Sequence, residues 1–483
     1  MSPRPPERPG HRQADLIGWW AAQDDRGDNG WTFRVRVTST DSPGNFEKVR
    51  TVRLFRSKPG SGEPLLDRQR TTILIWACVL IAVNQIGFGS IVPVVPLYAE
   101  AYGVGEFAVG LTIAVYGLAR FIANVPAGRL ADLRGRRATL AVGGVITVVG
   151  NLLTAVAPNY ELFLGARFVS GLGAAMVLTG GQLVVNDIAS PHNRGRLLSI
   201  YQGVFGFAVG IGPIPGGFLA DRFGLEIPFI AYAALAAAVT VIAWFAMPET
   251  RDLRPPHLAS ARTAVAAQAD STSPSTQPAQ LPPFTPATRT SFLLICGVSF
   301  SSFFARTGAL FSVIPLMAAG PMGLTTGQIG LGLGMNSLMS VLLAYPSGWL
   351  TDRFGRKAVI VPSTILTGAS LLLFAAADGF PGYVFAALIW GTAGGISSSA
   401  PAAYAADLAP PGRSAWLLSR YRTFADAGYV AGPLLLGLIA YAASPVAALW
   451  ACAALLVVAG ATFGLRAPET LPARLRPADP VSP

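Results

Sequence analysis

The chain has 483 residues, of which 52% are hydrophobic and 13% are charged, and its mean hydropathy is +0.49. Soluble proteins carry about 25% charged residues, so this chain lacks the charge to cover a water-facing surface. The composition therefore excludes a soluble enzyme, a secreted disulfide scaffold and a disordered polymer. It predicts a polytopic membrane protein, and we attribute the net charge of +11 to loops beside the bilayer rather than to nucleic-acid binding.

Residues 1–70 differ from the rest of the chain. They are rich in Pro, Arg, Asp and Ser and contain no long apolar run, a composition typical of disorder. We predict a disordered cytoplasmic tail here. A weak alternation of apolar and polar residues in Thr32–Val37 leaves a short β-strand open as an alternative.

From Thr71 onward the chain contains twelve apolar segments, each long enough to cross the hydrocarbon layer of about 30 Å as a helix. A polar stretch, 251–289, separates six of them from the other six. The predicted fold is therefore an all-α membrane protein with twelve transmembrane helices in two six-helix bundles. The N-terminal bundle covers 71–250 and the C-terminal bundle 290–470, followed by a short cytoplasmic tail, 471–483. The segments are 72–98, 107–127, 138–158, 162–185, 197–219, 227–247, 290–315, 327–347, 358–377, 382–405, 415–442 and 445–465.

Positive residues gather in alternate loops. Because arginine and lysine favour the cytoplasmic side of a membrane, these loops predict cytoplasmic termini and a cytoplasmic linker in a multi-pass protein of the cell membrane. The residues concerned are Arg129, Arg134, Arg136, Arg137, Arg194, Arg196, Arg353, Arg356, Lys357 and Arg413.

An internal repeat relates the two halves. The segment PAGRLADLRGRR at 126–137 returns as PSGWLTDRFGRK at 346–357. The same offset relates Asp187 to Asp407 and the Gly-Pro pair at 212–213 to the pair at 432–433, and we call residues related by this offset repeat equivalents. Such a repeat predicts a duplicated six-helix unit, with two pseudo-symmetric bundles and a binding site between them at mid-membrane.

These motifs resemble those of the major facilitator superfamily, specifically its twelve-span drug/proton antiporter branch. The resemblance covers about Thr71 to Leu471. It implies a small-molecule substrate, protons as the coupling ion, no cofactor and a monomer in the lipid bilayer. The first helix contains Asn84 and Gln85 but no carboxylate, whereas many proton-coupled relatives carry one in this helix, which leaves the coupling mechanism open.

The resemblance assigns conformational roles to two motifs. In the loop motif, Asp132 is expected to cap the eleventh helix near Gly412 and so latch the two halves, unless the basic loop only fixes topology. In the fifth-helix antiporter motif, the Gly and Pro residues form either a gasket against leak or ordinary close packing. The loop motif and its repeat comprise Gly128, Asp132, Gly135, Arg136, Arg137, Gly348, Asp352, Arg353, Gly355 and Arg356, and the antiporter motif comprises Gly212, Pro213, Gly216 and Gly217.

Ionisable residues at membrane depth are costly and are functional candidates by default. We predict that Asp426 in the eleventh helix pairs with Arg120 in the second, and that protonation of Asp426 breaks this pair. Arg422, four residues before Asp426, is a local alternative partner, and pairing with neither arginine also stays open.

Two further arginines lie within the predicted spans. We expect Arg167 to bond to Asn84 and Gln85 of the same bundle or to act as structural glue, and Arg306 to line the central cavity.

These features predict a secondary active transporter, with proton-coupled efflux of a small organic molecule or drug as the leading hypothesis. The excess of buried arginine favours an alternative, an organic-anion uptake or exchange carrier. A transporter-derived receptor is a third class. The sequence shows no nucleophile set, metal-ligand spacing or P-loop, so we predict neither an enzyme, nor a metal site, nor an ATP-driven pump.

Overall fold

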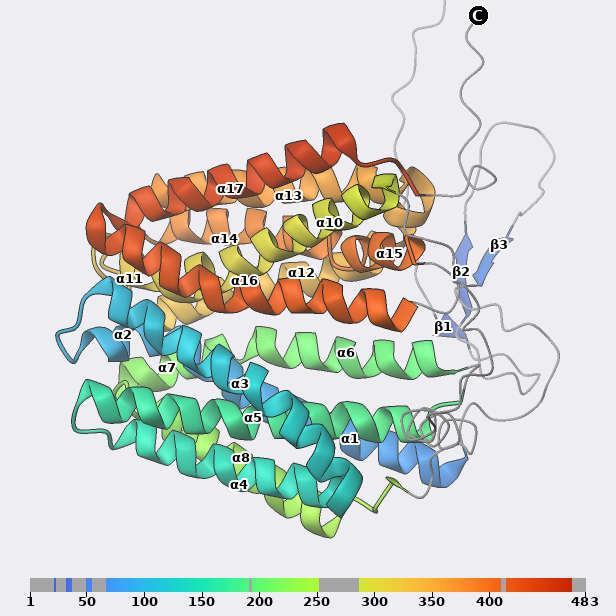
Figure 1. Cartoon of the computed structure of the whole chain (residues 1–483), viewed down its shortest axis with the longest axis horizontal. Helices are drawn as coiled ribbons and strands as arrows, with labels where there is room; N and C mark the ends of the chain where they lie inside the picture. Colours follow the sequence, from blue (N-terminus) through green and yellow to red (C-terminus); the bar gives the residue numbers. More distant parts are fainter. Residues whose placement is uncertain are drawn as a thin grey trace, which may run out of the picture. The chain divides into compact units, whose positions relative to one another are not determined.

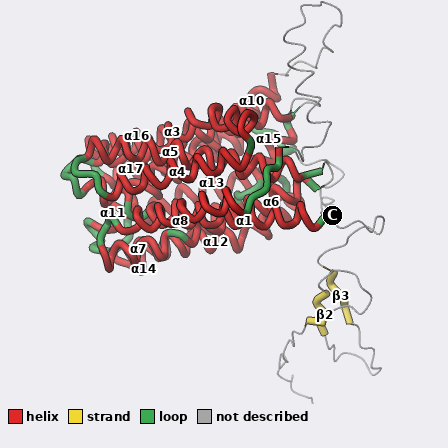
Figure 2. The backbone as a smooth tube through the Cα atoms, turned by 90° about the horizontal axis from the view of Figure 1, so that it is seen from below, coloured by secondary structure: helices red, strands yellow, loops and turns green. Residues whose placement is uncertain are grey.

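The computed structural model describes residues 21–22, 32–36, 49–53, 67–190, 193–251, 286–409 and 414–470. Two units are distinguished, Met1–Leu65 and Leu66–Pro483. In the first, β1 (Ala21–Ala22), β2 (Thr32–Arg36) and β3 (Val49–Arg53) form an antiparallel sheet in that order, drawn in yellow in Figure 2.

Most of the predicted disordered tail, 1–70, lies outside the described residues. In the described part, the alternating segment, for which the sequence left a short β-strand open, forms β2 and pairs with β3. Strand pairing is made by backbone hydrogen bonds, so the composition of the segment gave no indication of it. Nearly all of the predicted linker and the whole short C-terminal tail also lie outside the described residues.

The second unit begins with the N-terminal bundle, shown in blue to green in Figure 1. The first predicted span is divided at Pro93 and the fifth at Gly212-Pro213, since proline cannot donate the backbone hydrogen bond that a continuous helix needs. The helices are α1 (Arg68–Ile91), α2 (Val95–Glu100), α3 (Glu106–Arg134), α4 (Arg136–Ala155), α5 (Tyr160–Ile188), α6 (Arg194–Ile211), α7 (Pro213–Phe223) and α8 (Ile227–Phe245).

The C-terminal bundle follows, in yellow to red in Figure 1. Its first helix contains a π-helical segment, η2, which continues directly from α10 and into α11. The elements are α10 (Pro286–Phe304), η2 (Ala305–Val313), α11 (Ile314–Ala319), α12 (Thr326–Phe354), α13 (Arg356–Ala375), α14 (Gly379–Ile396), α15 (Ala400–Asp407), α16 (Ser414–Ala442) and α17 (Pro445–Arg466).

In the described part of the chain, eleven helices are long and apolar enough to cross a membrane. The tenth predicted span is divided between α14 and α15 at Ser397–Ser399. Pro401 follows this break and prevents a continuous helix. Counted with this divided segment, the structure confirms the predicted twelve transmembrane segments in two six-helix bundles.

The contact between the bundles is pseudo-symmetric. α3 packs against α16, and α6 and α7 pack against α12. A Cβ atom at Gly110 of α3 would collide with the carbonyl oxygen of Pro433 in α16, and one at Gly330 of α12 with that of Pro213 in α7. The two glycines are repeat equivalents, and so are the two prolines. Both interfaces therefore use the same backbone contact, as the duplication requires.

The bundles contact each other closely at the predicted outer end. Gly217 of α7 meets the backbone of Thr326 at the start of α12, and Gly437 of α16 meets that of Glu106 at the start of α3. At the predicted cytoplasmic end, Gly128 has no atom within 4 Å of its Cβ position. The structure is therefore closed at the predicted outer end, with open space beside α3 at the other end.

Candidate functional site

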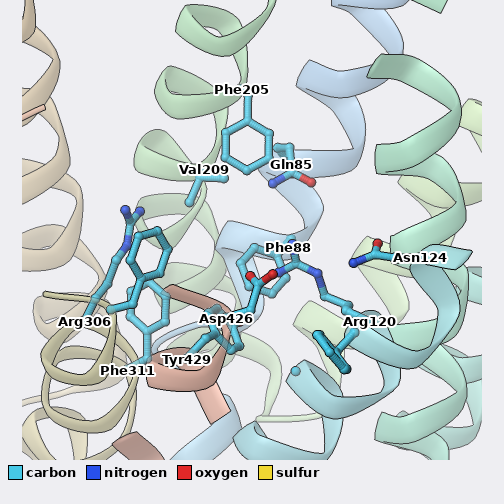
Figure 3. A pocket seen from close by; sticks show the side chains of 13 residues that line it. Gln85, Phe88, Arg120, Asn124, Phe205, Val209, Arg306, Phe311, Asp426 and Tyr429 are labelled. Atoms are coloured by element: carbon cyan, nitrogen blue, oxygen red, sulfur yellow. The ribbon is translucent and has the colours of Figure 1, made fainter. Parts of the chain in front are cut away.

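A cavity of about 260 Å³ lies between the two bundles. Its lining residues belong to α1, α3, α6, α10, η2 and α16, and Figure 3 shows their side chains around the cavity. Along α3, Gly117 is packed against Tyr429 of α16, whereas Phe121, one turn further, is 50% exposed. Within the cavity, α3 is therefore tightly packed against α16 at Gly117 and more open at Phe121, toward the predicted cytoplasmic side. Its lining residues are Gln85, Phe88, Gly117, Arg120, Phe121, Asn124, Phe205, Val209, Phe303, Arg306, Phe311, Asp426 and Tyr429.

The structure brings Arg120 and Asp426 into this cavity from opposite bundles. In Figure 3 the carboxylate of Asp426 and the guanidinium of Arg120 point toward one another. The charges of Arg120 and Arg422 both act on Asp426. Among the described residues, however, the salt bridges within 4.0 Å do not include either pair. A direct Arg120–Asp426 bond stays a prediction, as does the local alternative with Arg422.

Aromatic rings hold the two cavity arginines. The guanidinium of Arg120 lies 5.5 Å from the ring centroid of Tyr429, and that of Arg306 lies 5.7 Å from the centroid of Phe311. Such cation–π contacts stabilise a cation without neutralising it. Two guanidinium groups and one carboxylate line the cavity, so its formal charge is positive by one. One of the two guanidinium groups is that of Arg306, which lies in η2 of the C-terminal bundle.

Arg167 lies in α5, beside a smaller hollow that Phe88, Tyr116 and Tyr429 also line. It is only 2% exposed, and its guanidinium stacks 4.5 Å from the ring centroid of Tyr116. Its Nε and Nη1 atoms have no hydrogen-bond partner among the described residues. Arg167 is therefore a buried cation with unused donors, a costly arrangement unless a ligand supplies acceptors in another state.

The expected hydrogen bonds from Arg167 to Asn84 and Gln85 are absent from the described residues. Asn84 Nδ2 instead donates to Gln85 Oε1 at 2.9 Å. This bond lies within α1, and the buried Asn84 Oδ1 has no hydrogen-bond partner among the described residues, while Arg167 stacks on Tyr116.

The loop motif forms a buried ionic network within the N-terminal bundle. Arg136 is 1% exposed, and its Nε donates to Asp187 at 2.6 Å and its Nη1 to the Ala131 carbonyl at 2.8 Å. Glu249 accepts a hydrogen bond from the backbone N–H of Arg136 at 2.9 Å, so it places a negative charge at the N-terminus of α4.

The repeat reproduces this network in the C-terminal bundle. Arg356 Nε donates to Asp407 at 3.2 Å, its Nη1 donates to the Thr351 carbonyl at 2.9 Å, and Glu469 accepts from its backbone N–H at 3.0 Å. Each of these partners is the repeat equivalent of its counterpart in the N-terminal network. Arg356 also pairs with Asp352 at 2.9 Å.

The loop glycines have a conformational role. Gly135 and Gly355 both have positive φ, +93° and +100°, which glycine adopts without the cost that other residues incur. At each, a Cβ atom would also collide with the glutamate carboxylate that caps the next helix, Glu249 or Glu469.

The predicted latch by Asp132 is not tested, because Gly412 lies outside the described residues. Asp132 pairs with Arg136 at 3.5 Å within its own bundle. The remaining arginines of the motif lie over tryptophan rings, Arg137 at 4.9 Å from Trp244 and Arg353 at 5.1 Å from Trp349.

The antiporter motif packs in two directions. Gly212 lies against Gly89 of α1, and Gly216 lies against Ser90 of the same helix. Gly217 faces the other bundle and contacts Thr326. Pro213 begins α7 after the break in the fifth span. The motif therefore combines close packing within a bundle and a contact between bundles at the predicted outer end.

One interbundle residue was not predicted from the sequence. Asp221, in the last turn of α7, accepts a hydrogen bond from the Thr326 hydroxyl at the start of α12, and its carboxylate lies against Gly327. A carboxylate is favourable at a helix N-terminus. A comparison of the two halves could have singled out Asp221, because its repeat equivalent is Tyr441. The carboxylate is therefore specific to the N-terminal half.

Comparison with known proteins identifies the family. The family model described as the Major Facilitator Superfamily matches residues 77–327 and 295–482. The chain belongs to this superfamily. It is accordingly a membrane-embedded transporter and not an enzyme, and the resemblance read from the motifs is confirmed.

Relatives of this transporter include multidrug proteins. It is 23% identical to an uncharacterised MFS-type transporter of Methanocaldococcus jannaschii, with 77% of this chain and 92% of the relative covered. It is 24% identical to multidrug resistance protein 2 of Bacillus subtilis, covering 63% of this chain and 72% of that protein. The quinolone resistance protein NorA of Staphylococcus aureus is 27% identical over 31% of this chain and 38% of its own length.

Solved structures share the fold. A D-xylose–proton symporter superposes with a TM-score of 0.63 at 16% identity, covering 82% of this chain and 98% of the symporter. A peptide transporter superposes with a TM-score of 0.65 at 14% identity, covering 81% and 93%. These matches support the two-bundle architecture of the transporter.

Proposed function

We propose that this transporter exports a small organic molecule in exchange for protons by alternating access. The observation that carries the proposal is the cavity between the bundles, where Asp426 of one bundle faces Arg120 of the other. The names of two relatives, multidrug resistance protein 2 and quinolone resistance protein NorA, support efflux of drug-like compounds.

Asp426 is the proposed proton-coupling residue. When it is ionised, its attraction to Arg120 draws α16 toward α3 across the cavity. Protonation removes the negative charge and therefore this attraction, while Arg120 keeps its stacking contact with Tyr429. A proton and a substrate that bind different states of this interface are thermodynamically coupled.

Alternating access requires a second state that opens the predicted outer end. In that state the α3–α16 and α7–α12 contacts at Gly110 and Gly330 separate, and the loop motifs approach the opposite bundle. The positive loops support an orientation in which the present cavity faces the cytoplasm of a cell-membrane protein. Export then starts from this state.

The second candidate function is uptake or exchange of an organic anion. Two arginines and one aspartate line the cavity, and the unused donors of Arg167 lie close to it, since Phe88 and Tyr429 line both hollows. This charge balance favours an anionic or zwitterionic substrate over a lipophilic cation.

Proteoliposomes with an imposed pH gradient test both functions. A mixed panel of anionic, neutral and cationic compounds is offered with the lumen either acidic or alkaline. Because an acidic lumen drives antiport into a vesicle and an acidic exterior drives symport, the direction identifies the coupling whichever way the protein inserts. We expect accumulation with an acidic lumen.

Asp426→Asn separates coupling from binding. This variant is expected to abolish gradient-driven accumulation while retaining exchange of labelled for unlabelled substrate, because the site still forms but does not titrate. Asp378→Asn, at an exposed position outside the cavity, is the matched control and is expected to behave as wild type. Full gradient-driven accumulation by Asp426→Asn would exclude Asp426 as the coupling residue.

A further inference from the structure

A second hollow lies on the C-terminal bundle, between α13 and α17, with a volume of about 650 Å³. It shares no lining residue with the central cavity. Lys357 and Glu469 mark one end, where α13 begins. The remaining wall is apolar and includes Pro362 and Gly464. We call this hollow the α13–α17 groove.

The position of the groove matches the boundary of the membrane. Both α13 and α17 are among the helices long and apolar enough to cross a bilayer. The groove starts at the first residues of α13 and at the last residues of α17. Its charged end therefore lies where lipid headgroups begin, and its apolar part extends along the hydrocarbon.

The charged end presents a cation. The carboxylate of Glu469 accepts hydrogen bonds from the backbone N–H groups of Arg356 at 3.0 Å and Lys357 at 2.9 Å, so its charge is engaged by the N-terminus of α13. The salt bridges among the described residues do not involve the ammonium of Lys357. Lys357 can therefore contact an anionic group at the groove entrance.

The internal repeat shows that the groove is specific to the C-terminal half. At the equivalent place in the N-terminal bundle, the guanidinium of Arg137 lies over the indole of Trp244 at 4.9 Å. The repeat equivalents of these two residues are Lys357 and Gly464. The tryptophan that covers the cation in one bundle is thus replaced by a residue without a side chain in the other.

We propose that the α13–α17 groove is a binding site for an anionic phospholipid. One acyl chain lies along the apolar wall beside Pro362 and Gly464, and the headgroup phosphate contacts Lys357. A ligand with one charged end and one long apolar part fits both the charge distribution and the place of the groove in the bilayer. The proposal does not depend on the transported substrate.

Lipid retention by the full-length protein tests this site. The purified protein in detergent is titrated with phosphatidylglycerol or phosphatidylcholine, and retained lipids are counted by native mass spectrometry. Gly464→Trp, which restores the tryptophan of the other bundle, is expected to remove one retained phosphatidylglycerol. Trp244→Gly, which opens the equivalent place, is expected to add one.

A less disruptive substitution at the same position keeps the test informative if Gly464→Trp does not fold. A Cβ atom at Gly464 would lie 3.3 Å from Val361, so Gly464→Leu fills the groove with a small adjustment and is expected to remove the same lipid. Retention of that phosphatidylglycerol by folded Gly464→Leu and Gly464→Trp would overturn the proposal, as would a wild-type groove that retains detergent only.

Lys357→Gln tests the headgroup contact. It is expected to weaken phosphatidylglycerol binding about fivefold, the effect of one basic residue on an anionic lipid, and to leave phosphatidylcholine binding unchanged. Arg466→Gln removes a cation at the exposed end of α17 that does not line the groove, and it is expected to have no effect. Equal losses in the two variants would show a general surface charge and refute a site at Lys357.

Discussion

The two copies of the loop network predict different costs for the same substitution. Arg136 and Asp187 have side chains that are 1% and 4% exposed, whereas Arg356 and Asp407 are 15% and 33% exposed. Arg136→Gln leaves a buried carboxylate that keeps a hydrogen bond from Thr250 at 3.2 Å but loses its ion pair. Breaking a buried pair costs about 3 kcal/mol or more.

Arg356→Gln is expected to cost about 1 kcal/mol, because water screens a partly exposed pair and solvates the remaining carboxylate. The difference of about 2 kcal/mol corresponds to roughly thirtyfold in the unfolding equilibrium. Reversible unfolding of the purified protein in mixed micelles measures both free energies.

A double-mutant cycle isolates the pair energy. Adding Asp187→Asn to Arg136→Gln is expected to recover part of the lost stability, since no buried charge then remains, and the corresponding recovery for Asp407→Asn in Arg356→Gln is expected to be smaller. If Arg356→Gln destabilises the protein as much as Arg136→Gln, the argument from burial is refuted.

Three further predictions concern the bundle interface and the buried cation. Asp221→Ala removes the acceptor at the start of α12 and is expected to speed amide hydrogen exchange in that turn about tenfold, with no change at the start of α13. Gly110→Ala and Gly330→Ala place a methyl group against the carbonyls of Pro433 and Pro213, and both variants are expected to transport less in vesicles. Gly165→Ala, the control, has open space around its Cβ position and is expected to stay active. Equal activity of all three variants would contradict the role of these contacts. Arg167→Met removes a buried cation with unused donors and is expected to raise the thermal midpoint while lowering anion transport; a lowered midpoint with unchanged transport would show that the cation only stabilises the fold.

The internal repeat identified residues of the loop network from the sequence, but it did not show which of them bond to one another. Asp187 and Asp407 were related by the offset of the repeat, yet nothing in the sequence indicated that each aspartate bonds to the motif arginine of its own bundle. An arginine and an aspartate so far apart along the chain become neighbours only when α4 packs against α5. The same limit explains why the sequence left two alternatives open for Arg167, bonding to Asn84 and Gln85 or a structural role.

The sequence by itself determined the membrane class, the twelve segments, the duplication and the family, because each depends on composition or on a regular spacing along the chain. Tertiary structure alone decided which charges meet. It placed Arg120 and Asp426 in one cavity, left Nε and Nη1 of Arg167 without a hydrogen-bond partner among the described residues, and bonded Asp221 to the start of α12. Burial and pairing of a charge depend on which helix faces pack together, and sequence spacing within one helix carries no information about the facing helix.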